Sequence, residues 1–106
     1  MRVWLDDERP MPDGYDVLVR TAPEAIDLIR SGQVTKISLN HDLGPPEAGT
    51  GYDVAKAIAE MAYHGRFPEI SFRVHIANPV GRKNIVDCLQ NAKRFWWERA
   101  KESAES

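Results

Sequence analysis

Apolar residues gather in four short runs along the chain, and polar or turn-forming residues follow each run. The runs span residues 2–5, 15–20, 36–39 and 69–77. They are rich in Val, Ile, Leu and Phe, and the last run alternates apolar and polar residues at the two-residue period of a strand. The pattern therefore predicts four β-strands, of which the last is the longest.

Three longer segments repeat their apolar residues at the helical period. They span residues 21–32, 50–65 and 78 onward. Thr21 with Glu24, and Thr50 with Asp53, have the spacing of a capping box, in which each residue satisfies a backbone N–H group of the other. The third segment starts with an Asn-Pro pair, which suits an N-cap and a first helical turn.

Strands that alternate with helices predict an α/β fold with a mainly parallel sheet. The loop between the first two strands is barely as long as a parallel crossover requires, so we expect the second strand to be short or poorly paired. A chain of 106 residues, 42% hydrophobic and 28% charged, has enough length for one compact core and too little for two ordinary domains. We expect one domain over residues 1–102 and a frayed tail over 103–106.

The charge balance argues against two classes of partner. The chain has 14 Lys and Arg residues against 16 Asp and Glu residues, a formal net charge of -2. Bulk attraction to nucleic acid or to an anionic membrane is therefore not expected. Cys88 is the one cysteine and cannot form an internal disulfide, and no leader or long apolar run begins the sequence. These features predict a cytoplasmic protein.

Polar residues capable of chemistry follow three of the four predicted strands. After the first, third and fourth strands come Asp6, Asp7 and Arg9, then Asn40, His41 and Asp42, then His75 and Asn78. Ligands of open α/β sheets bind at the carboxyl ends of the strands. Because these ends share one rim of a parallel sheet, we predict a single site there.

The acidic and imidazole groups at this rim have two interpretations. Asp6, Asp7 and Asp42 could supply the hard oxygen ligands that Mg²⁺ or Mn²⁺ prefers. Alternatively, Asp6 or Asp7 caps a turn in the following loop. His41 and His75 suit general acid and base catalysis near neutral pH, although each could also be a hydrogen-bonded structural residue.

Candidate phosphate binders are Arg9 and the start of the last helix. Asn78 precedes free N–H donors at a helix N-terminus, Gly81 allows close approach to the backbone, and Arg82 and Lys83 add positive charge. The alternative is an ordinary capped helix with solvated basic residues. Neither common glycine-rich phosphate-loop pattern occurs in the chain.

The segment KRFWWERAK, residues 93–101, interleaves basic residues with aromatic ones. Such aromatic side chains can stack on single-stranded nucleic acid. Trp96, however, continues the apolar stripe of the last helix. We therefore expect Trp97 to cover an edge or to meet a second copy in a homodimer through the C-terminal helix, and we do not expect nucleic acid as a partner.

Four motifs occur in order over nearly the whole chain: LDDERP, SLNHDLG, TGYD and VHIANPVG. Together they resemble the motifs of cyclic-phosphate processing receiver domains, a family of shortened, stand-alone receivers. The resemblance implies a small three-layer, receiver-like (flavodoxin-like) fold, with a mainly parallel sheet of about four strands and three helices. Asn40 stands where a receiver carries its phosphorylated aspartate, and an amide cannot accept a phosphoryl group in that way.

The family is proposed to process cyclic phosphates, such as the ADP-ribose cyclic phosphate left by RNA repair. The resemblance implies functional roles for Asp6, Asp7, Arg9, His41, Asp42, His75 and Asn78. Our leading hypothesis is a metal-assisted phosphoesterase with a small nucleotide-derived substrate and Mg²⁺ or Mn²⁺ as cofactor. The alternative, which Asn40 favours, is a non-catalytic pseudo-receiver that binds a nucleotide or a partner protein.

Overall fold

The computed structural model describes residues 1–40, 42–65, 69–75 and 79–105. Its strands are β1 (Arg2–Leu5), β2 (Val17–Val19), β3 (Lys36–Leu39) and β4 (Ser71–Val74). They form one parallel sheet in the order β2-β1-β3-β4. The parallel sheet of four strands predicted from the sequence is therefore confirmed.

The described helices are α1 (Ala22–Arg30), α2 (Gly51–His64) and α3 (Pro79–Glu105), with a 3₁₀ turn at Pro46–Ala48. A capping box starts α2: Thr50 Oγ1 accepts from the Asp53 N–H at 3.2 Å, and Asp53 Oδ2 accepts from the Thr50 N–H at 2.9 Å. At the start of α1, Thr21 Oγ1 accepts from the Glu24 N–H and donates to the Glu24 carboxylate. Helices α1 and α2 therefore begin at the N-cap residues that the sequence predicted, Thr21 and Thr50.

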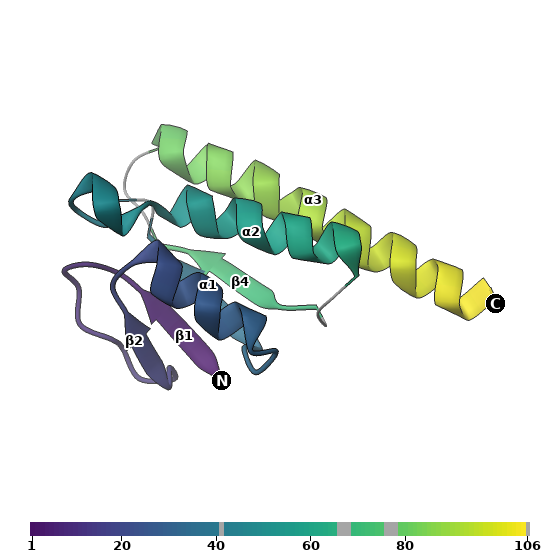
Figure 1. Cartoon of the computed structure of the whole chain (residues 1–106), viewed down its shortest axis with the longest axis horizontal. Coiled ribbons are helices and arrows are strands. Elements are labelled where there is room, and N and C mark those ends of the chain that lie inside the picture. The colour runs from purple at the N-terminus through teal and green to yellow at the C-terminus, as the bar shows by residue number, and fades with distance from the viewer. Residues whose placement is uncertain (41, 66–68, 76–78, 106) are drawn as a thin grey trace.

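All three helices lie on one face of the sheet (Figure 1). The connections β2-α1-β3 and β3-α2-β4 advance across the sheet in the same direction, so right-handed crossovers place α1 and α2 on the same side, and α3 packs along α2. The receiver-like α/β class is confirmed. The described helices nevertheless make one layer and not the expected two, because no helix lies between β1 and β2 to cover the other face.

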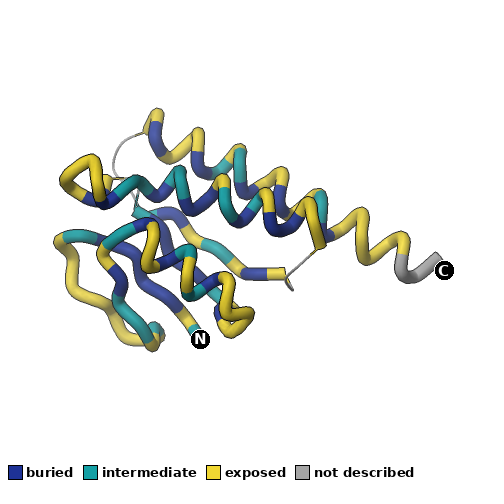
Figure 2. Tube along the Cα trace, viewed as in Figure 1, coloured by how far each residue is buried: buried dark blue, intermediate teal, exposed yellow. Residues whose placement is uncertain are grey.

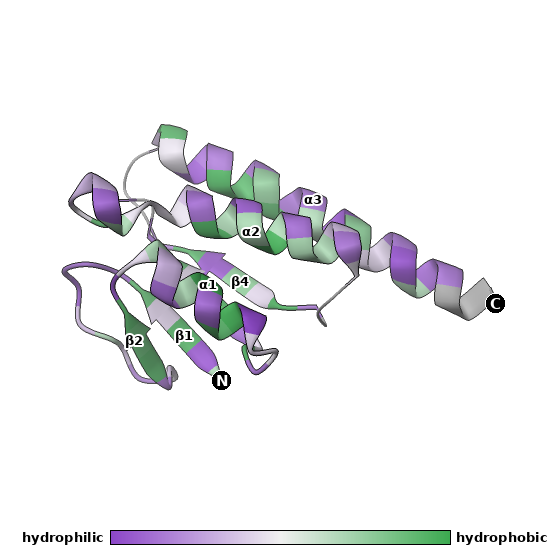
Figure 3. Ribbon diagram, viewed as in Figure 1, coloured by the Kyte–Doolittle hydropathy of each residue, from purple (hydrophilic) through white to green (hydrophobic). Residues whose placement is uncertain are grey.

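The hydrophobic core lies between the sheet and this helical layer (Figure 2). The fully buried strand residues of the core are Val3, Leu5, Ile37 and Leu39. Along α2 and α3 hydrophobic and hydrophilic residues alternate, as expected for helices with one buried stripe (Figure 3). On each strand the residues between these core positions point to the helix-free face.

The first connection holds β2 against β1 without a helix. Asp16 donates its N–H to the Arg2 carbonyl at 2.8 Å, and its carboxylate accepts from the Arg2 backbone and guanidinium at 2.8 to 3.1 Å. The hydrogen bonds from Arg2 lower the pKa of Asp16 to about 2. As expected, β2 is short, but its pairing with β1 is regular over all three of its residues.

Two elements differ in length from the sequence prediction. β4 spans Ser71–Val74, shorter than the predicted run over 69–77, of which residues 76 and 77 lie outside the described part. α3 continues to Glu105, although a frayed tail was expected after residue 102. Its C-terminal end projects beyond the rest of the domain (Figure 1), and among the described residues Trp96 is its last buried side chain.

Candidate functional site

The carboxyl end of the sheet brings together side chains that lie far apart in the sequence. Asp6 comes directly after β1, Ser38 lies within β3, and His75 comes directly after β4. All three belong to the helix-free face, because they alternate with the core residues of their strands. The parallel register therefore places them side by side.

These three residues form a continuous hydrogen-bonded chain. His75 Nε2 lies 3.0 Å from Asp6 Oδ2, and His75 Nδ1 lies 2.6 Å from Ser38 Oγ. Asp6 and Ser38 are fully buried, while 14% of the His75 side chain is exposed. Each end of the imidazole is therefore held by a buried oxygen, and the ring orientation is fixed.

Asp6 also organises the loop that follows it. Its Oδ1 accepts the backbone N–H groups of Glu8 at 2.8 Å and of Arg9 at 2.9 Å. Burial raises the pKa of Asp6, but these two N–H groups and His75 together outweigh it and hold the pKa below its ordinary value. Asp6 is therefore ionised at neutral pH. Its bonds to the N–H groups of Glu8 and Arg9 are those of a residue that caps a turn, the alternative considered for it from the sequence.

The proton positions on His75 follow from its two partners. Burial lowers the pKa of His75, although the neighbouring Asp6 carboxylate opposes this effect, so the imidazole is neutral at pH 7. An ionised carboxylate can only accept, so Nε2 must carry the proton that points to Asp6. Nδ1 is then the acceptor, and the Ser38 hydroxyl donates to it.

Trp4 and Arg9 enclose this chain from two sides. The Trp4 ring stacks on the His75 ring, with centroids 3.8 Å apart and planes inclined by 10°. Arg9 donates from Nη1 to the His75 carbonyl at 3.0 Å, and the same nitrogen lies 3.8 Å from Asp6 Oδ2. Because 54% of the Arg9 side chain is exposed, its guanidinium is a positive group at the solvent side of the site.

Asp7 and Asp42 lie at a second part of the rim. Asp42 Oδ1 accepts from the Gly44 N–H at 3.1 Å, and a Cβ at Gly44 would lie 3.5 Å from Asp7 Oδ2. Asn40 donates its side-chain N–H to the Asp42 carbonyl at 2.9 Å. The loop 42–44 therefore lies close to Asp7, and the Asn40 amide acts as a structural donor to that loop.

The described residues do not fit a metal centre built on Asp6. Both of its oxygens are already engaged, by two N–H groups and by His75, and the Arg9 cation lies nearby. Among the residues that the structure describes, no three His, Cys, Asp or Glu side chains gather closely enough to hold a metal ion. Asp7 and Asp42 keep the oxygen chemistry that Mg²⁺ or Mn²⁺ prefers.

The predicted phosphate binders at the start of α3, Gly81, Arg82 and Lys83, differ from one another in their contacts and in their burial. Arg82 donates from Nη1 to the Val74 carbonyl at 3.1 Å, beside β4. Lys83 pairs with Asp87 on the exposed surface of α3, with Nζ 2.8 Å from Oδ2, and this contact raises the pKa of Lys83. Gly81 is buried in the first turn of α3. His41 and Asn78 lie outside the described residues.

Sequence reasoning missed two members of the site, Ser38 and Trp4. Ser38 is a polar residue inside the otherwise apolar run ISL, and its full burial demands a partner, which His75 provides. Trp4 alternates with Val3 and Leu5 and therefore had to face away from the core. The alternation of each strand is the signal that could have identified both residues.

The fold and site together define a small receiver-like α/β domain with a polar centre at the carboxyl end of its sheet. The family model of the cyclic-phosphate processing receiver domain matches residues 1–91, and the chain belongs to this family. No curated protein and no solved structure matches the chain significantly. Among the described helices, none is both long and apolar enough to cross a membrane.

Proposed function

We propose that the protein opens a cyclic phosphate on a nucleotide-derived substrate, such as the ADP-ribose cyclic phosphate that RNA repair produces. Membership of the family supports the substrate class. The observation that carries the proposal is the contact of 3.0 Å between His75 Nε2 and the buried Asp6 carboxylate at the carboxyl rim of the sheet. This pairing resembles the arrangement by which many hydrolases orient a catalytic histidine.

His75 acts as the general base in this proposal. Its Nδ1 is the acceptor nitrogen, and a proton taken there creates an imidazolium that the Asp6 carboxylate stabilises through Nε2. In the structure the Ser38 hydroxyl occupies Nδ1. Rotation of Ser38 about its Cα–Cβ bond frees this nitrogen to take the proton of an attacking water. As the water oxygen bonds to phosphorus, the ring P–O bond breaks, and the imidazolium returns its proton to the departing ribose oxygen.

Arg9 and the loop 42–44 bind the phosphate in this proposal. The exposed guanidinium of Arg9 supplies positive charge next to His75, as the negative charge on the phosphoryl oxygens grows. A divalent cation at Asp7 and Asp42 would add charge stabilisation when bound. His41 and Asn78, from the same motifs, are proposed as a second acid–base group and a further phosphate donor.

The second candidate function is a non-catalytic module that binds a nucleotide or a partner protein. One observation favours it: both nitrogens of His75 are already hydrogen-bonded within the protein. A histidine satisfied in this way can serve the fold alone. The two candidates differ in whether ligand binding is followed by a product.

Phosphorus NMR separates the two candidates. The pure protein is incubated with ADP-ribose 1″,2″-cyclic phosphate and with 2′,3′-cyclic nucleotides, with and without Mn²⁺. The proposal predicts conversion of a cyclic resonance to a monoester, lost by about 10²-fold or more in His75→Gln, the typical contribution of a general base. His64→Gln, at the exposed C-terminal end of α2, is the matched control and should turn over normally. Unchanged spectra for all substrates, together with ligand-induced thermal stabilisation, would support the binding module instead.

A further inference from the structure

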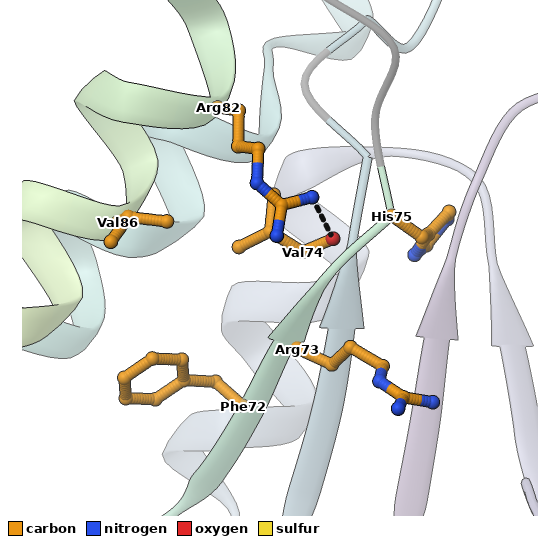
Figure 4. A pocket seen from close by; sticks show the side chains of 6 residues that line it. All are labelled: Phe72, Arg73, Val74, His75, Arg82 and Val86. Carbon is orange, nitrogen blue, oxygen red and sulfur yellow. Dashed lines mark hydrogen bonds between the residues drawn. The ribbon is translucent and has the colours of Figure 1, made fainter. Parts of the chain in front are cut away.

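The outer edge of β4 borders a hollow of about 540 Å³ (Figure 4). Its lining residues are Phe72, Arg73, Val74, His75, Arg82 and Val86. Four of them are consecutive in the chain, and Phe72 points toward α3 while Arg73 and His75 point to the other face of the strand. The hollow therefore lies beside the strand and not over one of its faces.

The backbone of β4 has hydrogen-bonding groups that point into this hollow. Ser71 donates its N–H to the carbonyl of Thr35, just before β3, and His75 donates to the carbonyl of Leu39, at 3.0 Å each. Alternate residues of β4 therefore bond inward. Phe72 and Val74 then direct their backbone groups outward. Over the described part of the chain, the sheet contains no strand on this side of β4.

Arg82 covers part of this edge with its side chain. It reaches from α3 and donates from Nη1 to the Val74 carbonyl at 3.1 Å (Figure 4). A charged side chain over an edge strand is a common protection against unwanted strand pairing. Because Arg82 belongs to an exposed position of α3, it can leave the carbonyl without any change in the core.

We propose that the outer edge of β4 binds an extended peptide segment of a partner protein, with apolar residues alternating with acidic ones. A strand beside β4 would direct alternate side chains to its two faces. On the helix side they would meet the apolar groups of Phe72 and Val86, and on the other side they would meet Arg73.

The charges around the edge select acidic residues in the partner. Arg73 and Arg82 line the hollow, and Lys93 Nζ lies 5.3 Å from the centre of the Phe72 ring. When the peptide takes over the Val74 carbonyl, the guanidinium of Arg82 is released to pair with a carboxylate. After this exchange of partners, the Val74 carbonyl and the Arg82 guanidinium each still have a hydrogen-bonding partner.

A second copy of this chain fits the edge less well. Antiparallel pairing of two β4 strands through the outward residues Phe72 and Val74 places Arg73 directly opposite Arg73 of the copy. Like charges at directly opposed positions destabilise a strand pair. An acidic peptide has the opposite charge at that position.

A peptide titration followed by amide NMR tests the proposal. The probe is the blocked heptapeptide Thr-Glu-Val-Glu-Val-Glu-Thr, and its control carries Lys in place of each Glu. The proposal predicts shifts of the Phe72 and Val74 amide signals and at least about tenfold weaker binding of the Lys peptide, since tenfold corresponds to a single lost charge contact. No shift of these amides up to about 1 mM acidic peptide, the weak end of specific recognition, overturns the proposal.

Phe72→Pro removes the outward N–H while the inward bonds of the neighbouring residues remain, which an edge strand tolerates. This variant should fold and lose peptide binding, whereas Phe72→Leu, which keeps the N–H, should retain it. Equal binding by Phe72→Pro and the wild type would contradict strand addition.

If Phe72→Pro fails to fold, a wild-type titration with a peptide N-methylated at alternate residues replaces it. Loss of binding on methylation supports backbone pairing, and unchanged binding overturns it. Concentration-dependent dimerisation that blocks the peptide would assign this edge to a second copy and also overturn the proposal.

Discussion

The two faces of β1 have different neighbours. On one face, Val3 and Leu5 are fully buried against the helical layer. On the other face, which no described helix covers, Trp4 and Asp6, the residue directly after the strand, contact His75. The same short segment therefore supplies part of the core and part of the candidate site. On the helix-free face, the Trp4 ring stacks on His75, and hydrogen bonds join the polar side chains of Asp6, His75 and Ser38.

The largest expected effect belongs to the helix side. Leu5→Ala should lower the free energy of unfolding by about 2–5 kcal/mol, because it leaves a cavity in a fully buried position. Urea unfolding measures the change. Leu18→Ala, at a half-buried position on the other face, is the control and should cost clearly less. Equal losses at both positions would show that the helix-free face is packed as tightly as the core.

Asp6→Asn should have the next largest effect, because it removes the charge of a fully buried, hydrogen-bonded group. The amide oxygen can still accept the two backbone N–H groups, but its NH₂ group faces the proton on His75 Nε2. A loss of about 1–3 kcal/mol in the free energy of unfolding is expected.

Asp7→Asn is the matched control for that substitution, with an expected change within about 0.5 kcal/mol. Chemical denaturation of both variants compares them. If Asp6→Asn is as stable as the wild type, the ionised carboxylate of Asp6 does not stabilise the site.

Acid should weaken the helix-free face before the core. Because the pKa of His75 is lower in the folded chain than in the unfolded chain, the unfolded chain binds the proton first as the pH falls. The stabilisation from neutral His75 is complete above about pH 6.5 and is lost as the pH drops below this value. Asp6 follows the same sign in a more acidic window, below about pH 3.9.

Denaturation curves between about pH 7.5 and 5.5 measure this dependence. In His75→Gln the contribution of His75 is lost, so the free energy of unfolding should change less with pH over this window. A wild-type protein that becomes more stable relative to His75→Gln as the pH falls would mean that His75 is protonated in the fold.

The smallest expected effect is that of Ser38→Ala. The change removes one hydroxyl, leaves His75 Nδ1 without its donor and should cost about 0.5–1.5 kcal/mol. If His75 is the base of the proposed reaction, this variant retains turnover, because Nδ1 becomes free for the substrate. Loss of turnover in a fully folded Ser38→Ala protein would instead give the Ser38 hydroxyl a direct part in proton transfer.

Sequence reasoning predicted the strands and helix starts because these depend on local periodicity and on capping pairs such as Thr50 with Asp53. The single helical layer depends on which connection lacks a helix, and it could have been deduced from the right-handed crossover rule. The residues next to Asp6 in the sequence could not show whether this carboxylate binds a metal or a side chain, because its partner His75 lies 69 residues away. Long-range pairing decides whether a strand-end carboxylate faces solvent or another side chain.

The most direct test of the central claim is a long-range ¹H–¹⁵N NMR spectrum of the histidine rings at neutral pH, with the His75 signals assigned from His75→Gln. The account predicts a neutral ring with the proton on Nε2, facing Asp6, and a bare Nδ1 that accepts from Ser38. A proton on Nδ1, or a doubly protonated ring at this pH, would contradict it.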